Sequence, residues 1–237
     1  MKNLKNWDKK TWQSSDKYIS SVINFLEKRI KFYKEMKILD IGCGRGKIIS
    51  SLSKKYKMNC LPLGIDIVEH KDIAKEIRFT KINVLKYLSK TKEKFDLILF
   101  KQSIHFVKSA EIKKILVSSK KNLHPKGKII ILALHPTENH WPLFRVFKSR
   151  LIQSLKKDAI ILNIIKSNFK KYKVNYFNFK VKMTKVNYLQ MIKNRFTSCL
   201  LNLKTRELKN GIEEIKKNYK KRLAFHDKLI CITYKKK

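Results

Sequence analysis

Three glycines at alternate positions follow a short apolar run early in the chain. Residues 38–41 have β-strand character, and Gly42, Gly44 and Gly46 then allow the backbone to turn sharply and to approach a ligand closely. An apolar pattern with helical spacing begins at Ile48. The turn therefore lies between the carboxyl end of a strand and the first turn of a helix, where free backbone N–H groups attract a carboxylate or a phosphate.

The residues around this turn narrow the kind of ligand. Asp40 precedes the glycines, and a carboxylate at that place suits a cationic amine and repels a pyrophosphate. The dinucleotide fingerprint also requires its third small residue one position later than Gly46, where this chain has Lys47. The spacing therefore disfavours a nicotinamide or flavin dinucleotide.

The motif Asp40-x-Gly42-x-Gly44-x-Gly46 resembles the first motif of the class I S-adenosylmethionine-dependent methyltransferases. A second apolar run ends at Asp66, 66 − 46 = 20 residues after the last glycine. A parallel strand ending there would bring a carboxylate to paired ribose hydroxyls. The resemblance implies that S-adenosylmethionine is the cofactor.

The same resemblance extends the expected cofactor site to the ends of two neighbouring strands. Ile67 follows Asp66, and Asn83 and Val84 follow the third apolar run, where the family holds the adenine edge. The family more often has Asp at the position of Asn83, but an amide keeps an acceptor for the exocyclic amine and adds a donor for a ring nitrogen. We therefore expect Ile67, Asn83 and Val84 to contact the nucleoside.

The loop after the fourth expected strand contains the candidate catalytic residue. Residues 95–100 form a nearly continuous apolar run, typical of a parallel strand covered on both faces, and Lys101 and His105 follow. His105 matches a histidine of small-molecule members of the family, in which this loop faces the methyl group. We expect it to act as general base for an acceptor that holds a proton. Lys101 is expected beside the cofactor, where an ammonium near a sulfonium is disfavoured unless it swings away or holds a substrate carboxylate.

Five residues outside these motifs are candidates for substrate contact. His135, His140 and Trp141 follow the fifth expected strand, at the edge where doubly wound sheets bind ligands. Trp12 lies in a segment that folds over the cofactor in similar small-molecule methyltransferases, although core packing is the commoner role of such a tryptophan. Arg195 could clamp a carboxylate through its guanidinium.

The net charge of +39 raises the alternative of an RNA substrate. Only eight of the 57 basic residues are arginine, whereas bidentate recognition of phosphate or guanine prefers arginine. The basic residues are spread along the whole chain, and the Asn/Asp-Pro-Pro-aromatic motif of amine-modifying nucleic-acid members is absent. We therefore interpret most lysines as solvated faces and nucleic acid as the less favoured partner.

The apolar pattern predicts an α/β fold with a doubly wound, mostly parallel seven-stranded sheet of the Rossmann-like methyltransferase type, with an added helical cap. We divide the 237 residues of this single expected domain into an N-terminal helical segment (1–35), a cofactor-binding core (36–135), and a cap with the C-terminal half of the sheet (136–237). Two helical segments are expected in the cap, around 142–156 and 159–170. The expected strands span 37–41, 61–66, 79–83, 95–100, 128–134, 174–182 and 229–234.

Other features bound the setting of the protein. No apolar stretch approaches the roughly 18 residues of a membrane span, and the N-terminus lacks an apolar signal core, so we expect a cytoplasmic protein without a membrane partner. The four cysteines show no zinc or disulfide spacing, so no metal is expected. Nothing in the pattern indicates an oligomeric state.

Three functions from different classes are compatible with these features. The cap and the aromatic N-terminal segment favour methyl transfer to a small-molecule substrate, an anionic metabolite included, mainly by orientation of the acceptor. Charge alone favours an RNA methyltransferase. Lys101 beside a sulfonium favours a non-catalytic S-adenosylmethionine-binding protein.

Overall fold

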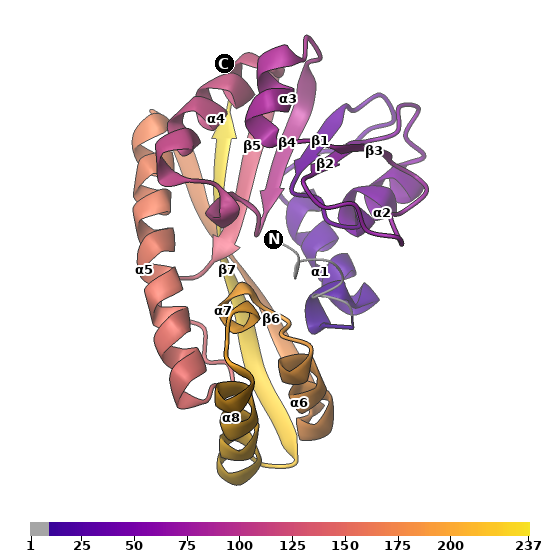
Figure 1. Cartoon of the computed structure of the whole chain (residues 1–237). Helices are drawn as coiled ribbons and strands as arrows, with labels where there is room; N and C mark the ends of the chain where they lie inside the picture. Colours follow the sequence, from indigo (N-terminus) through magenta and orange to yellow (C-terminus); the bar gives the residue numbers. More distant parts are fainter. Residues whose placement is uncertain (1–9) are drawn as a thin grey trace.

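A computed structural model describes residues 10–237 of the chain and contains one seven-stranded sheet (Figure 1). The strand order is β3-β2-β1-β4-β5-β7-β6; the first five strands are parallel, and β7 is antiparallel to both β5 and β6. This confirms the predicted fold class. The strands are β1 (Ile38–Ile41), β2 (Leu63–Asp66), β3 (Arg78–Lys81), β4 (Phe95–Lys101), β5 (Leu123–Leu134), β6 (Tyr172–Thr184) and β7 (Arg222–Lys235).

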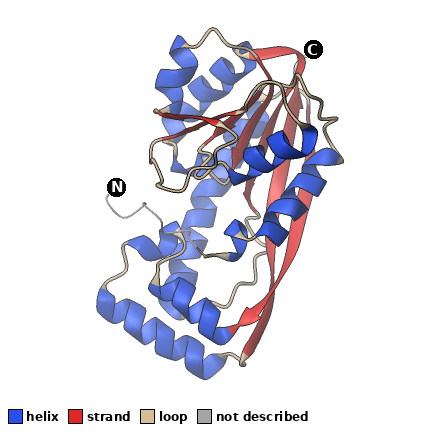
Figure 2. Ribbon diagram, turned by 90° about the vertical axis from the view of Figure 1, so that its right-hand side faces the viewer, coloured by secondary structure: helices blue, strands red, loops and turns tan. Residues whose placement is uncertain are grey.

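Helices lie on both faces of the sheet (Figure 2). Within the expected N-terminal segment, the first nine residues lie outside the described part of the chain, and α1 occupies much of the rest. The helices are η1 (Trp12–Ser14), α1 (Asp16–Glu27), α2 (Lys47–Tyr56), α3 (Val84–Lys90), η2 (Ile104–Phe106), α4 (Ser109–Lys121), α5 (Arg145–Asn168), α6 (Lys185–Lys193), α7 (Ser198–Leu201) and α8 (Thr205–Asn218).

Alternation along β4 divides the core into two layers. Leu97 and Leu99 contribute to the apolar cluster on the α1 and α2 face, whereas Ile98 and Phe100 contribute to the cluster that α3 and α4 cover. Successive side chains of a strand point to opposite faces, so a continuous apolar run is what a strand between two helical layers requires. The layers hold the carboxyl ends of β1, β2 and β4 side by side.

The expected boundary between two helices near residue 158 was wrong, because α5 runs unbroken from Arg145 to Asn168. No glycine or proline interrupts this span, so nothing in it breaks a helix. Its N-terminal half packs in one apolar cluster through Phe147 and Leu151, and its C-terminal half in the other through Ile165. The helix therefore covers the sheet as well as contributing to the cap.

The strand expected at 128–134 begins earlier, because residues 125–127 are already part of β5. The strand begins at Leu123, and its pairing with β4 shifts register between Phe95 and Leu97, so residues 124–127 form an irregular bulge. Lys126 takes up the distortion with a φ of +63°. A bulge of this kind bends a strand without ending it.

The last two strands form a long antiparallel ribbon whose connection holds the remaining helices. β6 and β7 pair from Tyr172–Tyr234 to Thr184–Arg222, and α6, α7 and α8 lie between them in sequence. Figure 1 shows the ribbon running past the other strands toward α6 and α8. Strands on both sides of residue 135 belong to one sheet. The division of the domain into three segments at residues 35 and 135 therefore stays a prediction.

No helix between residues 10 and 237 is long and apolar enough to cross a membrane. The same residues contain no cluster of histidine, cysteine and acidic side chains that could hold a metal ion.

Candidate active site

One cavity of about 650 Å³ opens at the carboxyl ends of β1, β2 and β4. One side is formed by the glycine turn, the end of β2 and the loop after β4. The opposite side is formed by Leu134, Trp141, α5 and residues 196–199. We call the residues of this opposite side the far wall: Leu134, Trp141, Leu151, Ser154, Asp158, Phe196, Thr197, Ser198 and Cys199.

The glycine turn has the backbone conformation that its sequence predicts. Gly42, Gly44 and Gly46 have φ values of +72°, +55° and +68°, in the left-handed region that favours glycine. A Cβ on Gly42 would meet the Cβ of Ser103, and one on Gly46 would meet the terminal Cδ1 of Ile77, so a side chain at either position would require its neighbour to shift. A Cβ on Gly44 would meet nothing within 4 Å, so the missing side chain leaves room in the cavity for a ligand.

Asp66 is held over this turn by backbone donors. Its Oδ2 accepts the N–H of Gly44 at 2.9 Å, and its Oδ1 accepts the N–H of Val68 at 3.0 Å. Each carboxylate oxygen can accept a second hydrogen bond, so the group is orientated yet still able to accept from two hydroxyls. Ile67, at 42% exposure, lines the cavity next to it.

Asn83 lines the cavity, but its side-chain oxygen accepts hydrogen bonds from the backbone of α3. Its Oδ1 accepts the N–H groups of Leu85 at 2.9 Å and Lys86 at 3.4 Å, as the N-cap of α3. N-capping therefore competes with the expected hydrogen bond from the adenine amine to this oxygen. The side-chain N–H₂ remains able to donate. Val84 lines the same part of the cavity.

Asp40 is a buried acid with an unused acceptor. It is 4% exposed and lines the cavity, and its Oδ1 has no hydrogen-bond partner among the described residues. Burial raises the pKa of Asp40 to about 7, and the nearby charge of Lys101 opposes this shift. A cationic donor at this point of the cavity would supply the missing bond and stabilise the ionised carboxylate. The ammonium group of S-adenosylmethionine has this chemistry.

Lys101, at the end of β4, lies between buried acidic and aromatic groups. Its Nζ is 4.8 Å from the centroid of the Tyr18 ring, and its charge acts on the carboxyl groups of Asp40 and Asp227. Asp227, on β7, is fully buried and accepts the indole N–H of Trp12 at 3.1 Å. The charge of Lys101 thus favours the ionised form of both buried acids, against the effect of their burial.

His105 lines the cavity from η2, as expected for a residue that faces the reaction. Burial lowers the pKa of His105 to about 4. The imidazole is therefore neutral at pH 7, where it can accept a hydrogen bond, but it holds a transferred proton weakly.

The two tryptophans predicted to contact the substrate have different places. Trp141 is in the far wall. Trp12 is not among the residues that line the cavity; it packs edge-on against Trp141 and Phe196, with ring centroids 5.3 and 5.1 Å away. Trp12 therefore supports the wall from behind.

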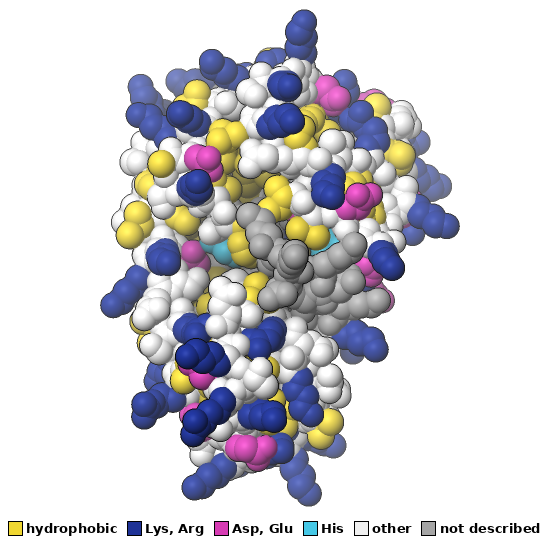
Figure 3. Space-filling view, in the orientation of Figure 1, with side chains coloured by type: hydrophobic (Ala, Val, Ile, Leu, Met, Phe, Trp, Pro, Cys, Tyr) yellow, Lys and Arg dark blue, Asp and Glu magenta, His cyan; other side chains and the backbone are white. Residues whose placement is uncertain are grey.

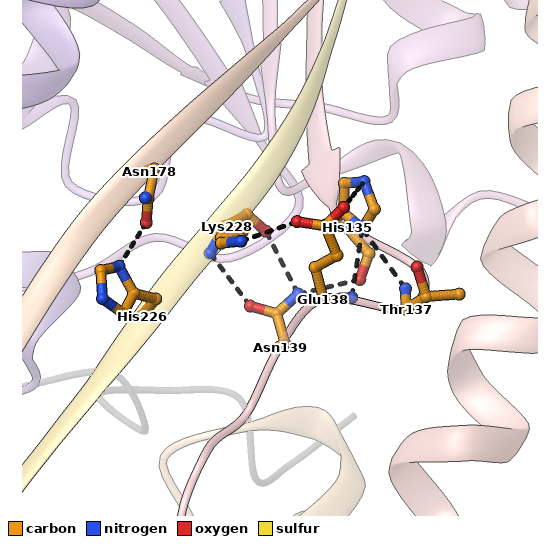
Figure 4. Close-up of polar contacts among 7 residues, drawn as sticks. All are labelled: His135, Thr137, Glu138, Asn139, Asn178, His226 and Lys228. Carbon is orange, nitrogen blue, oxygen red and sulfur yellow. Dashed lines mark hydrogen bonds and ion pairs between the residues drawn. The ribbon is translucent and has the colours of Figure 1, made fainter.

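The structure does not bring His135, His140 or Arg195 to the cavity. The Nδ1 of His135 accepts the N–H groups of Thr137 and Glu138, inside the network of Figure 4. His140 is exposed on the same loop.

Asn139 accounts for the orientation of that loop. Its amide donates to the carbonyl oxygens of His135 and Lys228 and accepts the N–H of Lys228, which ties the loop to β7 (Figure 4). Arg195 has a comparable structural use, because its guanidinium donates to the carbonyl oxygens of Leu200 and Leu201.

Asp158 is a cavity residue that no sequence motif marked. It is 8% exposed and has no hydrogen-bond or ion-pair partner among the described residues. Burial raises its pKa to about 6. A sequence signal existed, because an acid takes one position in a stripe of three- and four-residue steps along α5: Phe147, Leu151, Ser154, Asp158, Ile161 and Ile165.

The charge of the cavity differs from that of the whole chain. Lysine and arginine side chains are scattered over the face drawn in Figure 3. Within the described lining, basic and acidic residues are equal in number, namely Arg45, Lys47, Lys101 and Lys108 against Asp40, Asp66, Glu111 and Asp158. The excess of 39 positive charges thus belongs to the rest of the molecule.

Comparison with known proteins gives a family and a fold. A family model described as a methyltransferase domain matches residues 32–226. The YcgJ protein from Bacillus subtilis is 14% identical, with a TM-score of 0.58 over 92% of this chain and 98% of that one. A methyltransferase from Archaeoglobus fulgidus, described as dependent on S-adenosylmethionine, is 17% identical, with a TM-score of 0.54 over 92% and 94%.

A third similar structure is a phosphoethanolamine N-methyltransferase 2 of Haemonchus contortus, in complex with phosphomonomethylethanolamine and S-adenosylhomocysteine. It is 15% identical, with a TM-score of 0.53 over 95% of this chain and 58% of that one. No curated protein matches the chain. At these identities the solved structures show a shared fold, whereas the family model spans most of the sequence. The chain therefore belongs to the methyltransferase domain family and is a class I S-adenosylmethionine-dependent methyltransferase.

Proposed function

We propose that this enzyme methylates a small molecule that lies between the cofactor and the far wall. The observation that carries the proposal is that a single cavity extends from the glycine turn to the far wall, with a charge-balanced lining. Its volume of about 650 Å³ falls within the roughly 300–1,000 Å³ of typical ligand sites. A polynucleotide would instead be recognised through a basic path for phosphates, which the lining does not offer.

The residues divide the work of binding. In this proposal Asp66 accepts the ribose hydroxyls, Ile67 and Val84 contact the adenine, and Asp40 accepts the ammonium. S-adenosylmethionine supplies an electrophilic methyl group on a sulfonium. The chain's own contribution is orientation, because aligning an acceptor with that methyl group can provide several kcal/mol.

Lys101 bears on the charge of the acceptor. An anionic acceptor would need a positively charged side chain that no acid of the protein already attracts. The ammonium of Lys101 instead acts on the carboxyl groups of Asp40 and Asp227. This arrangement supports a neutral or cationic acceptor better than an anionic one.

Cofactor binding and acceptor class are tested separately. Calorimetry should show that Asp66→Ala binds S-adenosylhomocysteine at least tenfold more weakly than wild type, since losing the acceptor of two hydroxyls costs about 1.5–3 kcal/mol. Asp16→Ala, at an exposed site in α1, is the control and should bind like wild type. If the Asp66 variant kept its full affinity, the assigned ribose contact would be wrong.

The acceptor is then sought by measuring S-adenosylhomocysteine formation with a metabolite extract and with total RNA. We expect turnover with the extract and little dependence on salt. Turnover confined to RNA, with a steep loss of activity as salt rises, would contradict the proposal.

A further inference from the structure

Asp158 gives the far wall a chemical preference. It is the only charged side chain among the nine residues of that wall, and the structure describes all nine. Its neighbours there are apolar, such as Trp141 and Phe196, or neutral and polar, such as Ser154 and Thr197. An unpaired carboxylate in such surroundings is costly unless a ligand donates to it.

The described residues offer Asp158 no counter-charge. The residue is 92% buried (8% exposed), and no described residue makes a hydrogen bond or an ion pair with it. The other ionisable side chain among the nine wall residues, Cys199, is a thiol whose pKa is raised, first by burial and also by the charge of Asp158. That thiol therefore stays neutral and does not compensate the carboxylate.

Packing alone does not explain an acid at position 158. On the buried stripe of α5, an apolar side chain would pack without any desolvation cost. A carboxylate there lines the cavity, and the helix that carries it packs against η2, the element of His105. The acid is thus placed where an acceptor group would meet it.

We propose that the methyl acceptor is an amine and that its N–H group donates to the Asp158 carboxylate. This inference rests on the proposed function, because it assumes that a small acceptor occupies the cavity. Trp141 and Phe196 would pack against the carbon skeleton of the amine, and aromatic faces also attract a cation.

The proton balance of this arrangement is complete. An acceptor that enters as an ammonium ion passes one proton to the carboxylate, which leaves a lone pair on nitrogen. As methyl transfer occurs, the new C–N bond forms and the C–S bond breaks, so the sulfonium becomes a neutral thioether and the positive charge passes to the methylated nitrogen. Asp158 then releases the proton to solvent.

Binding of three size-matched probes tests the inference without turnover. Benzylamine, benzyl alcohol and benzoate are titrated by calorimetry into protein saturated with S-adenosylhomocysteine. Wild type should bind benzylamine at least about tenfold more tightly than benzoate, and Asp158→Asn should lose about tenfold in benzylamine affinity and much less in benzyl alcohol affinity. The matched control Asp16→Asn, at an exposed site, should keep the wild-type order.

The outcomes separate this inference from the proposed function. If wild type prefers benzoate, if Asp158→Asn keeps its affinity for the amine, or if no amine binds to protein that does bind S-adenosylhomocysteine, the amine assignment is overturned. If S-adenosylhomocysteine itself fails to bind, the proposed cofactor contacts are wrong as well. Thermal denaturation confirms that the variant is folded, since replacing an unpaired buried acid by its isosteric amide removes a desolvation cost.

Discussion

Replacing Asp40 by asparagine should make the protein more stable and a weaker binder of its cofactor. The carboxyl group is buried, and burial raises its pKa from 3.8 to about 7. A raised pKa means that the folded state holds the proton more tightly than the unfolded state does. Asp40 therefore contributes its full stability below about pH 4, and this contribution is lost as the pH rises through 7.

The size of the effect follows from the shift of the pKa. Three units at about 1.4 kcal/mol each give a ceiling of about 4 kcal/mol above pH 7. The neutral amide of Asp40→Asn escapes this loss, so the variant should match wild type near pH 4 and exceed it at pH 8. For a chain of this length 1 kcal/mol corresponds to about 2–4 °C in Tm, so the difference at pH 8 reaches at most about 8–16 °C.

Urea denaturation of the cofactor-free protein at pH 4, 6 and 8 measures this difference directly. Asp16→Asn, at an exposed site in the first turn of α1, serves as the control for the chemical change; it removes one charge near the helix N-terminus and should differ from wild type by less than about 1 kcal/mol at each pH. Calorimetry at pH 8 should show that Asp40→Asn loses at least about tenfold in affinity for S-adenosylmethionine, because an amide cannot balance an ammonium. Parallel pH profiles for wild type and Asp40→Asn, or an unchanged affinity, would refute the reasoning.

Two further predictions concern the turn and the imidazole. Gly44→Ala should lower the free energy of unfolding by about 1–2 kcal/mol, because the residue has a left-handed φ, and should also weaken the binding of S-adenosylhomocysteine. Gly46→Ala adds an overlap with Ile77 and should lower Tm further. Equal Tm values for the two variants would contradict this difference. Burial lowers the pKa of His105 to about 4 and raises that of Asp158 to about 6. The pH profile of kcat on an amine should therefore have an inflection near pH 6, which should persist in His105→Gln and vanish in Asp158→Asn. The opposite result would make His105 the base.

The parts of the fold that were predictable are those that one local pattern determines. β1, β2 and β4 are short apolar runs buried between two layers, and the glycine turn needs φ values that few other residues adopt. Asp66 could be predicted from its spacing after the glycine turn alone. In these places the local sequence and the tertiary structure favour the same conformation.

The remaining site residues depend on contacts that no local pattern encodes. The rule that ligands bind at the carboxyl edge of the sheet predicted residues 135–142 at the cavity, but of the three candidates there only Trp141 lines it. Asn139 instead ties the backbone of His135 to Lys228, which is distant in sequence. Asn83 was expected to meet adenine, and an equally local rule, N-capping, uses its oxygen first. Asp158 was missed because one acid in a helical stripe becomes informative only when the neighbouring surface is known.

The two sides of the cavity come from different stretches of the chain. The glycine turn, Asp66 and the loop after β4 precede residue 109, whereas most of the far wall is carried by α5 and by the connection between β6 and β7. The long pairing of those two strands anchors that connection independently of the glycine turn. Under the proposed function, substitutions in the second stretch are therefore expected to change the acceptor while the cofactor contacts are left intact. A chimaera that imports α5 to α8 from a relative would carry that relative's specificity with it.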